Sequence, residues 1–404
     1  MDNYKMCINC LSSYEADKEA CPFCGNANKN TNPNGALAVG TVLGGRYTVG
    51  NFVEIDGEGV IYTGVNNVKK SKVLIKEYMP VTLCAGRNKD GSILPKPESE
   101  VLFKTSMMDF TEVYRTLINL NGDESLSAVE DIISANGTAY AVTEFVEGID
   151  LEEYLDQFGG SLDWRDAMAM LEPLFITIEK LHRLNWVHLG ICPSNIIVNE
   201  DGIAKLVGYA TQGLRTQNSE IKATLYPGYS APEQYSVTEY KYASTDIYAL
   251  GAVLYRTITG RRPTSARDRE REDTLPQVAQ LTNVPRYVAA AINCALRLKS
   301  AERFTNVEEF REALANVGQV KAAPKGFNFA DFFNKDNKML LYIAAAVLAV
   351  IIIIFALWMI IKGVIPKPDD SSDMSESQSM VSPSPSASAS GEDFSKIPKF
   401  IGKK

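Results

Sequence analysis

The sequence predicts an α+β fold, with a small cysteine-rich module before it and one membrane span after it. Apolar residues alternate with polar ones over 46–65, which is typical of a β-hairpin. Across 164–185 the apolar residues recur at helical spacing instead. The run over 340–361 carries no charged residue, and as a helix it would be about 33 Å long, enough to cross a bilayer core of about 30 Å. With 404 residues, of which 45% are hydrophobic, the chain can bury one large core and smaller modules.

The charge balance and the cysteine distribution limit the partners and the compartment. The net charge is −8, so the chain lacks the basic footprint of a nucleic-acid-binding protein, and no nucleic-acid partner is expected. Four of the seven cysteines fall within the first 24 residues, a distribution that favours metal thiolates in a reducing compartment over a disulfide framework. The opening residues are too polar for a signal peptide. We therefore expect the N-terminal region to be cytosolic.

The early cysteines form two CxxC pairs in a segment too short to build a hydrophobic core. Zn²⁺ prefers four soft ligands in a tetrahedron, and each CxxC turn can present two thiolates to one ion. The second pair, in CPFCG, resembles the knuckle of a zinc ribbon. Four protein thiolates leave no open position, so we predict a structural zinc site in a module over 1–27, followed by a flexible linker over 28–42. A redox or disulfide pair is the alternative, although one CxxC would suffice for it. The predicted ligands are Cys7, Cys10, Cys21 and Cys24.

Two short motifs in the middle of the chain carry a resemblance to a known family. HLGICPSN at 188–195 and GYA at 208–210 resemble the catalytic loop and the metal-binding motif of protein kinases, HRDxxPxN and DFG. Further ordered motifs extend the resemblance over 43–316. It implies a bilobal α+β fold of the protein kinase type, with a Ser/Thr kinase activity if the site is active.

The resemblance also shows which catalytic groups are replaced. Gly190 stands where the family has the aspartate that accepts the substrate hydroxyl proton, and Gly208 stands where an aspartate holds Mg²⁺. His188 is retained, and Asn195 keeps the position of the second metal ligand. Losing a general base lowers a rate roughly 10²- to 10⁴-fold. The sequence therefore predicts a pseudokinase, in which ATP and Mg²⁺ binding stay open.

The residues expected to contact the phosphates of a nucleotide are altered as well. In the family, the hairpin turn is a glycine-rich loop whose amides cover the ATP phosphates. Aligned with that pattern, the loop keeps only the last family glycine, Gly59, although Gly57 lies close to it. Asp56 and Glu58 add two carboxylates that would repel a triphosphate, so an ordinary turn is the alternative. Lys76 ends the apolar run KVLIK, which resembles the VAIK motif and implies phosphate contact; a surface charge at a strand end is the alternative.

Two other parts of the nucleotide site follow from the resemblance. The family pairs its lysine with a glutamate from a helix, here expected over 107–120, and the pattern places that position at Val113. Glu112 is one residue away, which on a helix is a turn of about 100°, so the sequence gives no support for the usual pair. Beyond the helix, the backbone of Glu144 to Val146 is expected to face an adenine.

The scaffold residues of the family are present. Glu233 lies in an APE motif, and the resemblance implies that it pairs with Arg303. Asp246 occupies the position that ties down the backbone of the catalytic loop. These three residues are predicted to have structural roles.

The C-terminal part predicts a membrane anchor and an outer tail. A juxtamembrane linker over 317–339 leads into the span at 340–361, for which a buried globular helix is the alternative. A mild excess of lysine before the span favours a cytoplasmic N-terminus and an outside C-terminus. The tail over 362–404 is low in complexity. Its final FSKIPKFIGKK resembles the start of a PASTA repeat, a cell-wall-binding module, and an unstructured tail end is the alternative.

These observations predict a single-pass bacterial membrane protein that signals by binding protein partners at the cytosolic face. The inner domain would be a nucleotide-responsive or constitutive scaffold. The first alternative is an active Ser/Thr protein kinase that uses Lys76, Asn195 and an unrecognised carboxylate. The second places the function in the outer tail, as a wall or ligand sensor.

Overall fold

The computed structural model describes residues 4–7, 9–10, 12–27 and 32–315. The predicted linker over 317–339, span at 340–361 and tail over 362–404 lie outside these residues. Among the helices that are described, none combines the length and the apolar character that a membrane span requires.

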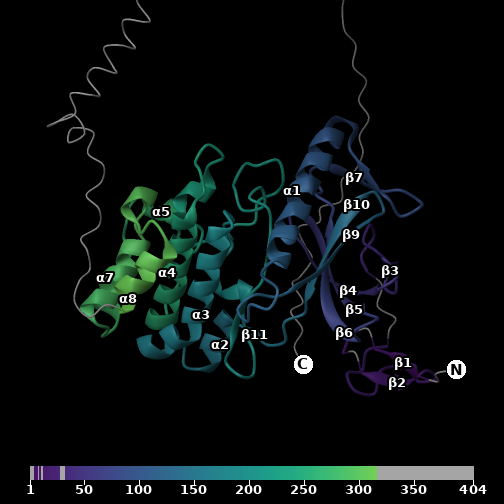
Figure 1. Ribbon diagram of the computed structural model, residues 1–404, viewed down its shortest axis with the longest axis horizontal. Helices are drawn as coiled ribbons and strands as arrows, with labels where there is room; N and C mark the ends of the chain where they lie inside the picture. The colour runs from purple at the N-terminus through teal and green to yellow at the C-terminus, as the bar shows by residue number, and fades with distance from the viewer. Residues whose placement is uncertain (1–3, 8, 11, 28–31, 316–404) are drawn as a thin grey trace, which may run out of the picture. The chain divides into compact units, whose positions relative to one another are not determined.

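An antiparallel sheet of six strands forms the first lobe (Figure 1). Its strand order is β3-β4-β5-β6-β10-β9. The predicted hairpin over 46–65 is present as β4 and β5. The strands are β3 (Val42–Leu43), β4 (Tyr47–Ile55), β5 (Gly59–Asn66), β6 (Ser71–Tyr78), β9 (Val129–Ala135) and β10 (Thr138–Glu144).

The two faces of this sheet bury different sets of residues, because side chains alternate along a strand. Val73 and Ile75 of β6 pack in one core with Tyr62. Ala139 and Ala141 of β10 face the opposite way and belong to the core that includes Phe110. Phe110 lies on helix α1 (Glu100–Ile118), so this helix packs against that face.

Helix α1 begins earlier than the predicted helix over 107–120. A 3-10 turn, η1 (Pro97–Ser99), leads directly into it. Before that turn, a short hairpin of β7 (Cys84–Arg87) and β8 (Ile93–Pro95) branches from the sheet. The helix therefore spans 19 residues.

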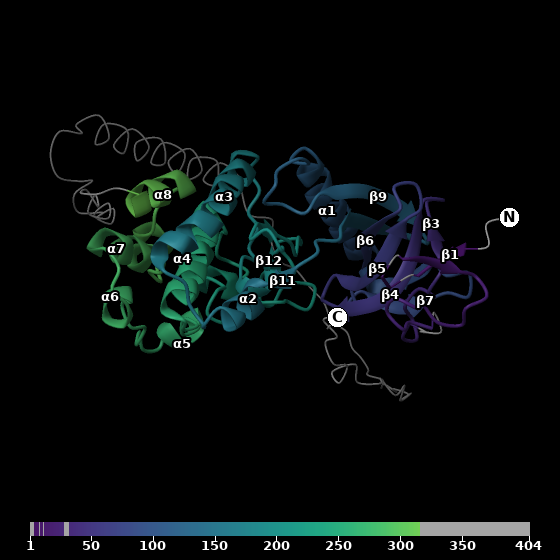
Figure 2. The ribbon, with the colours of Figure 1, turned by 90° about the horizontal axis from the view of Figure 1, so that it is seen from below.

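Helices form the second lobe, in which α3 and α4 lie side by side (Figure 2). Every residue of α4 from Thr245 to Ile258 is buried, and most of them are apolar, as expected for a helix that is enclosed on all sides. The predicted helix over 164–185 appears as α3. The helices of this lobe are α2 (Leu151–Gln157), α3 (Trp164–Arg183), α4 (Ala243–Thr259), α5 (Ala266–Arg269), α6 (Val278–Leu281), α7 (Arg286–Ala295) and α8 (Val307–Ala315).

Short elements between the lobes carry the catalytic-loop positions. Strand β11 (Ile149–Asp150) pairs with β12 (Ile196–Val198), and β12 pairs with β13 (Ala204–Leu206). The 3-10 turn η2 (Pro193–Asn195) immediately precedes β12. Asn195 and Gly208 therefore flank a tight hairpin, which brings the two motifs together.

A separate two-stranded hairpin forms the N-terminal module. Strand β1 (Tyr4–Met6) pairs antiparallel with β2 (Ser13–Glu15). Its small cluster of buried side chains contains Cys7, Tyr14 and Cys21.

Candidate functional site

Lys76 lies on β6 and is bound by the acidic turn between β4 and β5. Its Nζ is 2.8 Å from Asp56 Oδ2 and 2.5 Å from Glu58 Oε2. The Glu58 side chain is completely buried, and that of Lys76 is only 9% exposed. Burial alone would lower the pKa of Lys76, but the charges of Asp56 and Glu58 outweigh it and raise the pKa above its usual value. Lys76 is thus a buried, paired cation and not a surface charge.

Helix α1 contributes no carboxylate to this lysine. Val113, at the position where the family has glutamate, is buried. Glu112 is exposed and lies 3.7 Å from Arg115 on its own helix. The turn therefore supplies both carboxylates that pair with Lys76. The sequence placed them near the phosphate site but did not reveal the pairing.

The turn uses its own amides and closes onto the segment after the metal motif. Asp56 Oδ1 accepts hydrogen bonds from the backbone N–H of Glu58 and of Gly59, at 2.8 and 3.0 Å. Glu58 Oε1 accepts another from the N–H of Thr211, at 2.7 Å. A Cβ placed on Gly57 would lie 1.8 Å from the carbonyl oxygen of Lys222. The Glu58 and Gly59 amides of the turn, which in the family would face phosphates, are therefore engaged by the carboxylate of Asp56.

The catalytic-loop backbone is held by Asp246 of α4. Its carboxylate accepts hydrogen bonds from the N–H of His188 and of Leu189, each at 2.8 Å. The same carboxylate lies 2.9 Å from His182 Nε2. His188 is fully buried, and burial lowers its pKa to about 4. His188 is therefore neutral at pH 7, and its Nδ1 accepts from the N–H of Gly190 at 3.2 Å.

Arg215 fills the space beside the two glycines that replace aspartates. A Cβ on Gly190 would lie 2.9 Å from Arg215 Nε. Arg215 Nη2 donates to the carbonyl oxygen of Gly208 at 2.8 Å, and Nη1 donates to the hydroxyl of Tyr226 at 2.9 Å. The guanidinium also lies 5.0 Å from the centre of the Tyr226 ring. Arg215 is 3% exposed, so a buried cation lies beside Gly190, where the family has an aspartate, and against the backbone of Gly208.

Asn195 is likewise engaged by groups of the protein. Its Nδ2 donates to the carbonyl oxygen of Gly190 at 2.7 Å and to the hydroxyl of Tyr226 at 2.9 Å. A Cβ on Gly208 would lie 2.7 Å from Asn195 Oδ1. Mg²⁺ prefers carboxylate and water oxygens in an octahedron. This site has glycine at both aspartate positions, so it lacks the carboxylates that would bind Mg²⁺, and the Arg215 guanidinium nearby would repel the ion. The residues present therefore do not fit Mg²⁺.

The residues expected beside an adenine come at the end of β10. Glu144 Oε1 lies 2.7 Å from Lys205 Nζ, and its Oε2 accepts from the N–H of Ala128 at 3.1 Å. Val146 follows two residues later and is half-buried. The side chain of Glu144 therefore fixes this segment to the strand and loop beside it.

Glu233 and Arg303 form a bidentate pair, with Nη1–Oε1 and Nη2–Oε2 distances of 2.7 and 3.0 Å. Arg303 also donates to the carbonyl oxygens of Ser244 and Leu298. Both side chains are buried. The pair thus connects the APE segment to α4 and to the loop before α8.

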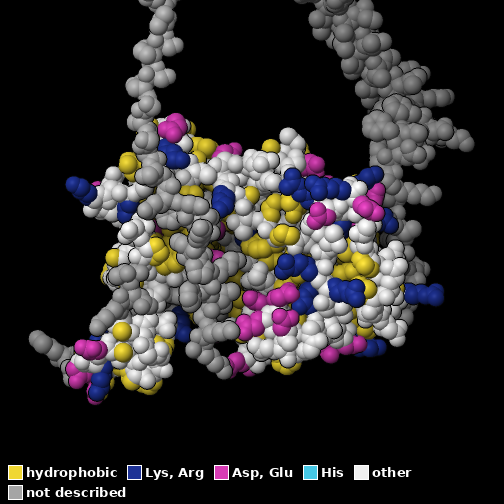
Figure 3. Space-filling view, turned by 180° about the vertical axis from the view of Figure 1, so that it is seen from behind, with side chains coloured by type: hydrophobic (Ala, Val, Ile, Leu, Met, Phe, Trp, Pro, Cys, Tyr) yellow, Lys and Arg dark blue, Asp and Glu magenta, His cyan; other side chains and the backbone are white. Residues whose placement is uncertain are grey.

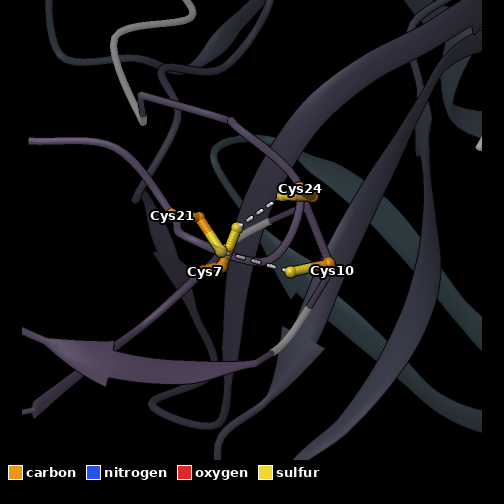
Figure 4. Close-up of side chains that lie close together, drawn as sticks. All are labelled: Cys7, Cys10, Cys21 and Cys24. Carbon is orange, nitrogen blue, oxygen red and sulfur yellow. Dashed lines mark hydrogen bonds between the residues drawn. The ribbon is translucent and has the colours of Figure 1, made fainter.

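The four early cysteines converge from two turns of the N-terminal module (Figure 4). Their sulfur atoms all lie within 4.8 Å of one another. The Cys7–Cys24 and Cys10–Cys21 sulfur pairs are each 3.5 Å apart, and all four thiols are free. Zinc–sulfur bonds of about 2.3 Å in a tetrahedron put sulfurs about 3.8 Å apart. These side chains therefore fit a zinc ion.

We expect replacement of Cys21 by serine to abolish zinc retention, because three thiolates and a weaker oxygen donor bind Zn²⁺ less tightly. Elemental analysis of the purified full chain should give one zinc per chain, and none for the variant. Cys294→Ser is the matched control, because Cys294 lies outside the cluster. Equal zinc content in the two variants would contradict the assignment of the four cysteines.

Three features together define a kinase-type domain. A lysine on a strand is buried and paired, an aspartate hydrogen-bonds the backbone of the catalytic loop, and the glutamate of the APE motif pairs with an arginine. A family model described as "Protein kinase domain" matches residues 103–316. The chain belongs to the protein kinase family.

Individual relatives agree with this assignment. The Ser/Thr protein kinase PknA of Mycobacterium tuberculosis is 28% identical over 307 residues, which are 71% of this chain and 64% of that protein. A sperm motility kinase of Mus musculus is 26% identical over 205 residues, 50% of this chain and 40% of that protein. The chain spans less than two thirds of the length of these curated relatives. The solved apo form of PpkA-294 is 27% identical, with a TM-score of 0.58, covering 70% of this chain and all of that one.

Proposed function

We propose that this chain is a pseudokinase that acts by binding protein partners and not by phosphoryl transfer. The observation that carries the proposal is Arg215, whose guanidinium lies where a side chain on Gly190 would point and donates to the carbonyl oxygen of Gly208. Gly190 and Gly208 are the positions of the base and of the metal ligand in the family. Without the base, the rate would fall roughly 10²- to 10⁴-fold. Without a metal carboxylate, the developing charge on the phosphoryl group loses a main stabilising partner.

We also propose roles for the segments before and after the kinase-type domain. The cysteine module would carry structural zinc, the 340–361 segment would anchor the chain in a membrane with a cytoplasmic N-terminus, and the tail would contact the cell wall. Interaction would occur at the cytosolic face. Acidic and basic side chains are interspersed on the described face in Figure 3, which supports protein partners over nucleic acid.

Phosphoryl transfer by the full chain tests the proposal. With labelled ATP and either Mg²⁺ or Mn²⁺, we expect no more label in the protein or in a generic substrate than the Lys76→Ala variant gives. An active Ser/Thr protein kinase run in parallel controls the assay. Transfer near 1 s⁻¹ that disappears in Lys76→Ala would instead establish the alternative, an active kinase with unusual catalytic residues.

A further inference from the structure

A surface pocket lies where helix α1 meets the catalytic loop and the segment that follows the metal motif. Its volume is about 380 Å³, within the range of about 300–1,000 Å³ that ligand sites have. Helix α1 contributes Ser106, Asp109 and Val113, and the other walls come from stretches within 185–189 and 211–221. Lys76 is not among the lining residues, so this pocket is a different site from the one around that lysine.

The charged side chains that line the pocket are both acidic. Asp109 and Glu220 belong to exposed residues, and none of the described lining residues is a lysine, an arginine or a histidine. Lys222 follows in the sequence but does not line the pocket. The carbonyl oxygen of Glu220 accepts a hydrogen bond from Thr82 Oγ1 at 3.0 Å, which fixes the backbone at this wall. The pocket therefore presents two carboxylates without a cation of its own.

A substitution in the catalytic-loop motif accounts for part of this charge balance. Leu189 lines the pocket and stands where the motif HRDxxPxN has arginine. It is 4% exposed, and Val113 and Ile221, which also line the pocket, are buried as well. An arginine at this position would bring a positive charge to the wall. Leucine instead leaves an apolar floor and a net negative lining.

Trp186 supplies an aromatic wall that is held in position. Its ring packs edge-on against His188 and Tyr209, with centroid distances of 5.6 and 6.3 Å. Tryptophan is the aromatic side chain that attracts a cation most strongly over its face. A guanidinium can stack on such a ring and bond carboxylates through its planar fork, whereas an ammonium group is a compact point charge. The lining therefore suits arginine better than lysine.

We propose that this pocket binds an arginine side chain of a partner protein, with apolar residues on either side of that arginine. Met108 and Leu184 are next to lining residues in the sequence and are 67% and 43% exposed, so apolar surface continues beyond the pocket. The two carboxylates would repel phosphate groups, which excludes nucleic acid and anionic lipid as the occupant. This inference rests on the proposed function, for which it names a site and the chemistry of the partner.

Calorimetric titration of the full chain with a short peptide tests the inference. The probe is glycine-leucine-arginine-phenylalanine-glycine, acetylated and amidated, and its control has citrulline, a neutral group of the same shape, in place of arginine. We expect the arginine peptide to bind at least about tenfold more tightly than the citrulline peptide. Equal affinities, or no binding of the arginine peptide, would overturn the inference.

N-acetylarginine amide distinguishes a protein partner from a small guanidinium compound. We expect it to bind at least about tenfold more weakly than the arginine peptide, because it cannot contact the apolar surface around the pocket. Equal affinity for the two probes would overturn the assignment to a protein partner.

Variants of the two carboxylates test the residues. Asp109→Asn and Glu220→Gln should each weaken binding of the arginine peptide about threefold, and the double variant about tenfold. Both residues are exposed, so the variants should fold. Glu112→Gln is the matched control, because Glu112 is exposed on the same helix but does not line the pocket. Unchanged affinity in the double variant would contradict the proposal.

A cation added to the pocket should compete with the arginine of the peptide. Gln212 is an exposed lining residue, and we expect Gln212→Lys to weaken binding at least about threefold. Gln157→Lys adds the same charge at an exposed position of α2 outside the lining and should have no effect. Equal affinities of these two variants would place the peptide elsewhere on the surface and overturn the inference.

The outcomes separate this inference from the proposed function. Absence of charge-dependent peptide binding together with absence of phosphoryl transfer overturns only the arginine site. Phosphoryl transfer that disappears in Lys76→Ala, together with charge-dependent peptide binding, overturns only the proposed function.

Discussion

Replacing Arg303 by methionine should lower the free energy of unfolding by about 3–5 kcal/mol. The reason is that Glu233 would keep a buried charge without its bidentate partner, and the carbonyl oxygens of Ser244 and Leu298 would lose their donors. Urea unfolding of the full chain, followed by far-UV circular dichroism, measures the change. We expect the helical lobe to be the part that is destabilised, because the Glu233–Arg303 pair connects segments of that lobe.

Arg115→Met is the matched control for this change. Arg115 lies 3.7 Å from Glu112, and both side chains are largely exposed, so the pair should contribute no more than about 1 kcal/mol. A second variant, Arg303→Met with Glu233→Gln, should recover part of the lost stability because the unpaired charge is gone. Equal losses in Arg303→Met and Arg115→Met would contradict the role assigned to the buried pair.

Restoring the metal aspartate by Gly208→Asp should destabilise the protein by about 2–4 kcal/mol and should not restore phosphoryl transfer. Gly208 has a φ of +81°, a conformation that side chains other than glycine rarely adopt. An added Cβ would also lie 2.7 Å from the amide of Asn195. Arg215 would still lie beside Gly190, where the base is missing. Urea unfolding and the labelled-ATP assay measure the two parts of the expectation.

Gly202→Asp separates the backbone effect from the contact. Gly202 has a similar φ of +77°, with nothing within 4 Å of an added Cβ. We therefore expect it to lose only about 1 kcal/mol. A Gly208→Asp variant that is as stable as Gly202→Asp and gains Mg²⁺-dependent transfer would refute the account of this centre.

Much of the fold could be predicted, because its signals are local or periodic. The alternation over 46–65 corresponds to β4 and β5, and the apolar spacing over 164–185 corresponds to α3. The two CxxC pairs brought four sulfurs together because the chain between them is short. These elements depend on neighbours in sequence, so the pattern is sufficient.

The charges at the catalytic centre could not be predicted from such patterns. Arg215 lies in a segment without helical or strand periodicity, and its position depends on contacts with Gly190, Gly208 and Tyr226. The pairing of Lys76 with Glu58 depends on how the turn folds back over β6. The one available signal was the acidic character of the turn, which indicated repulsion of phosphate but not a partner for lysine.

The consecutive residues Lys76 and Glu77 bear on how β6 finds its place in the sheet. Neighbouring side chains on a strand point to opposite faces, and Glu77 is buried on the other face, where it accepts hydrogen bonds from Tyr62, Tyr140 and Arg87. A slip of one residue would move Glu77 toward Asp56 and place Lys76 beside Arg87. Like charges would then meet on both faces, so electrostatic repulsion, in addition to the apolar pattern, excludes misregistered pairing during folding.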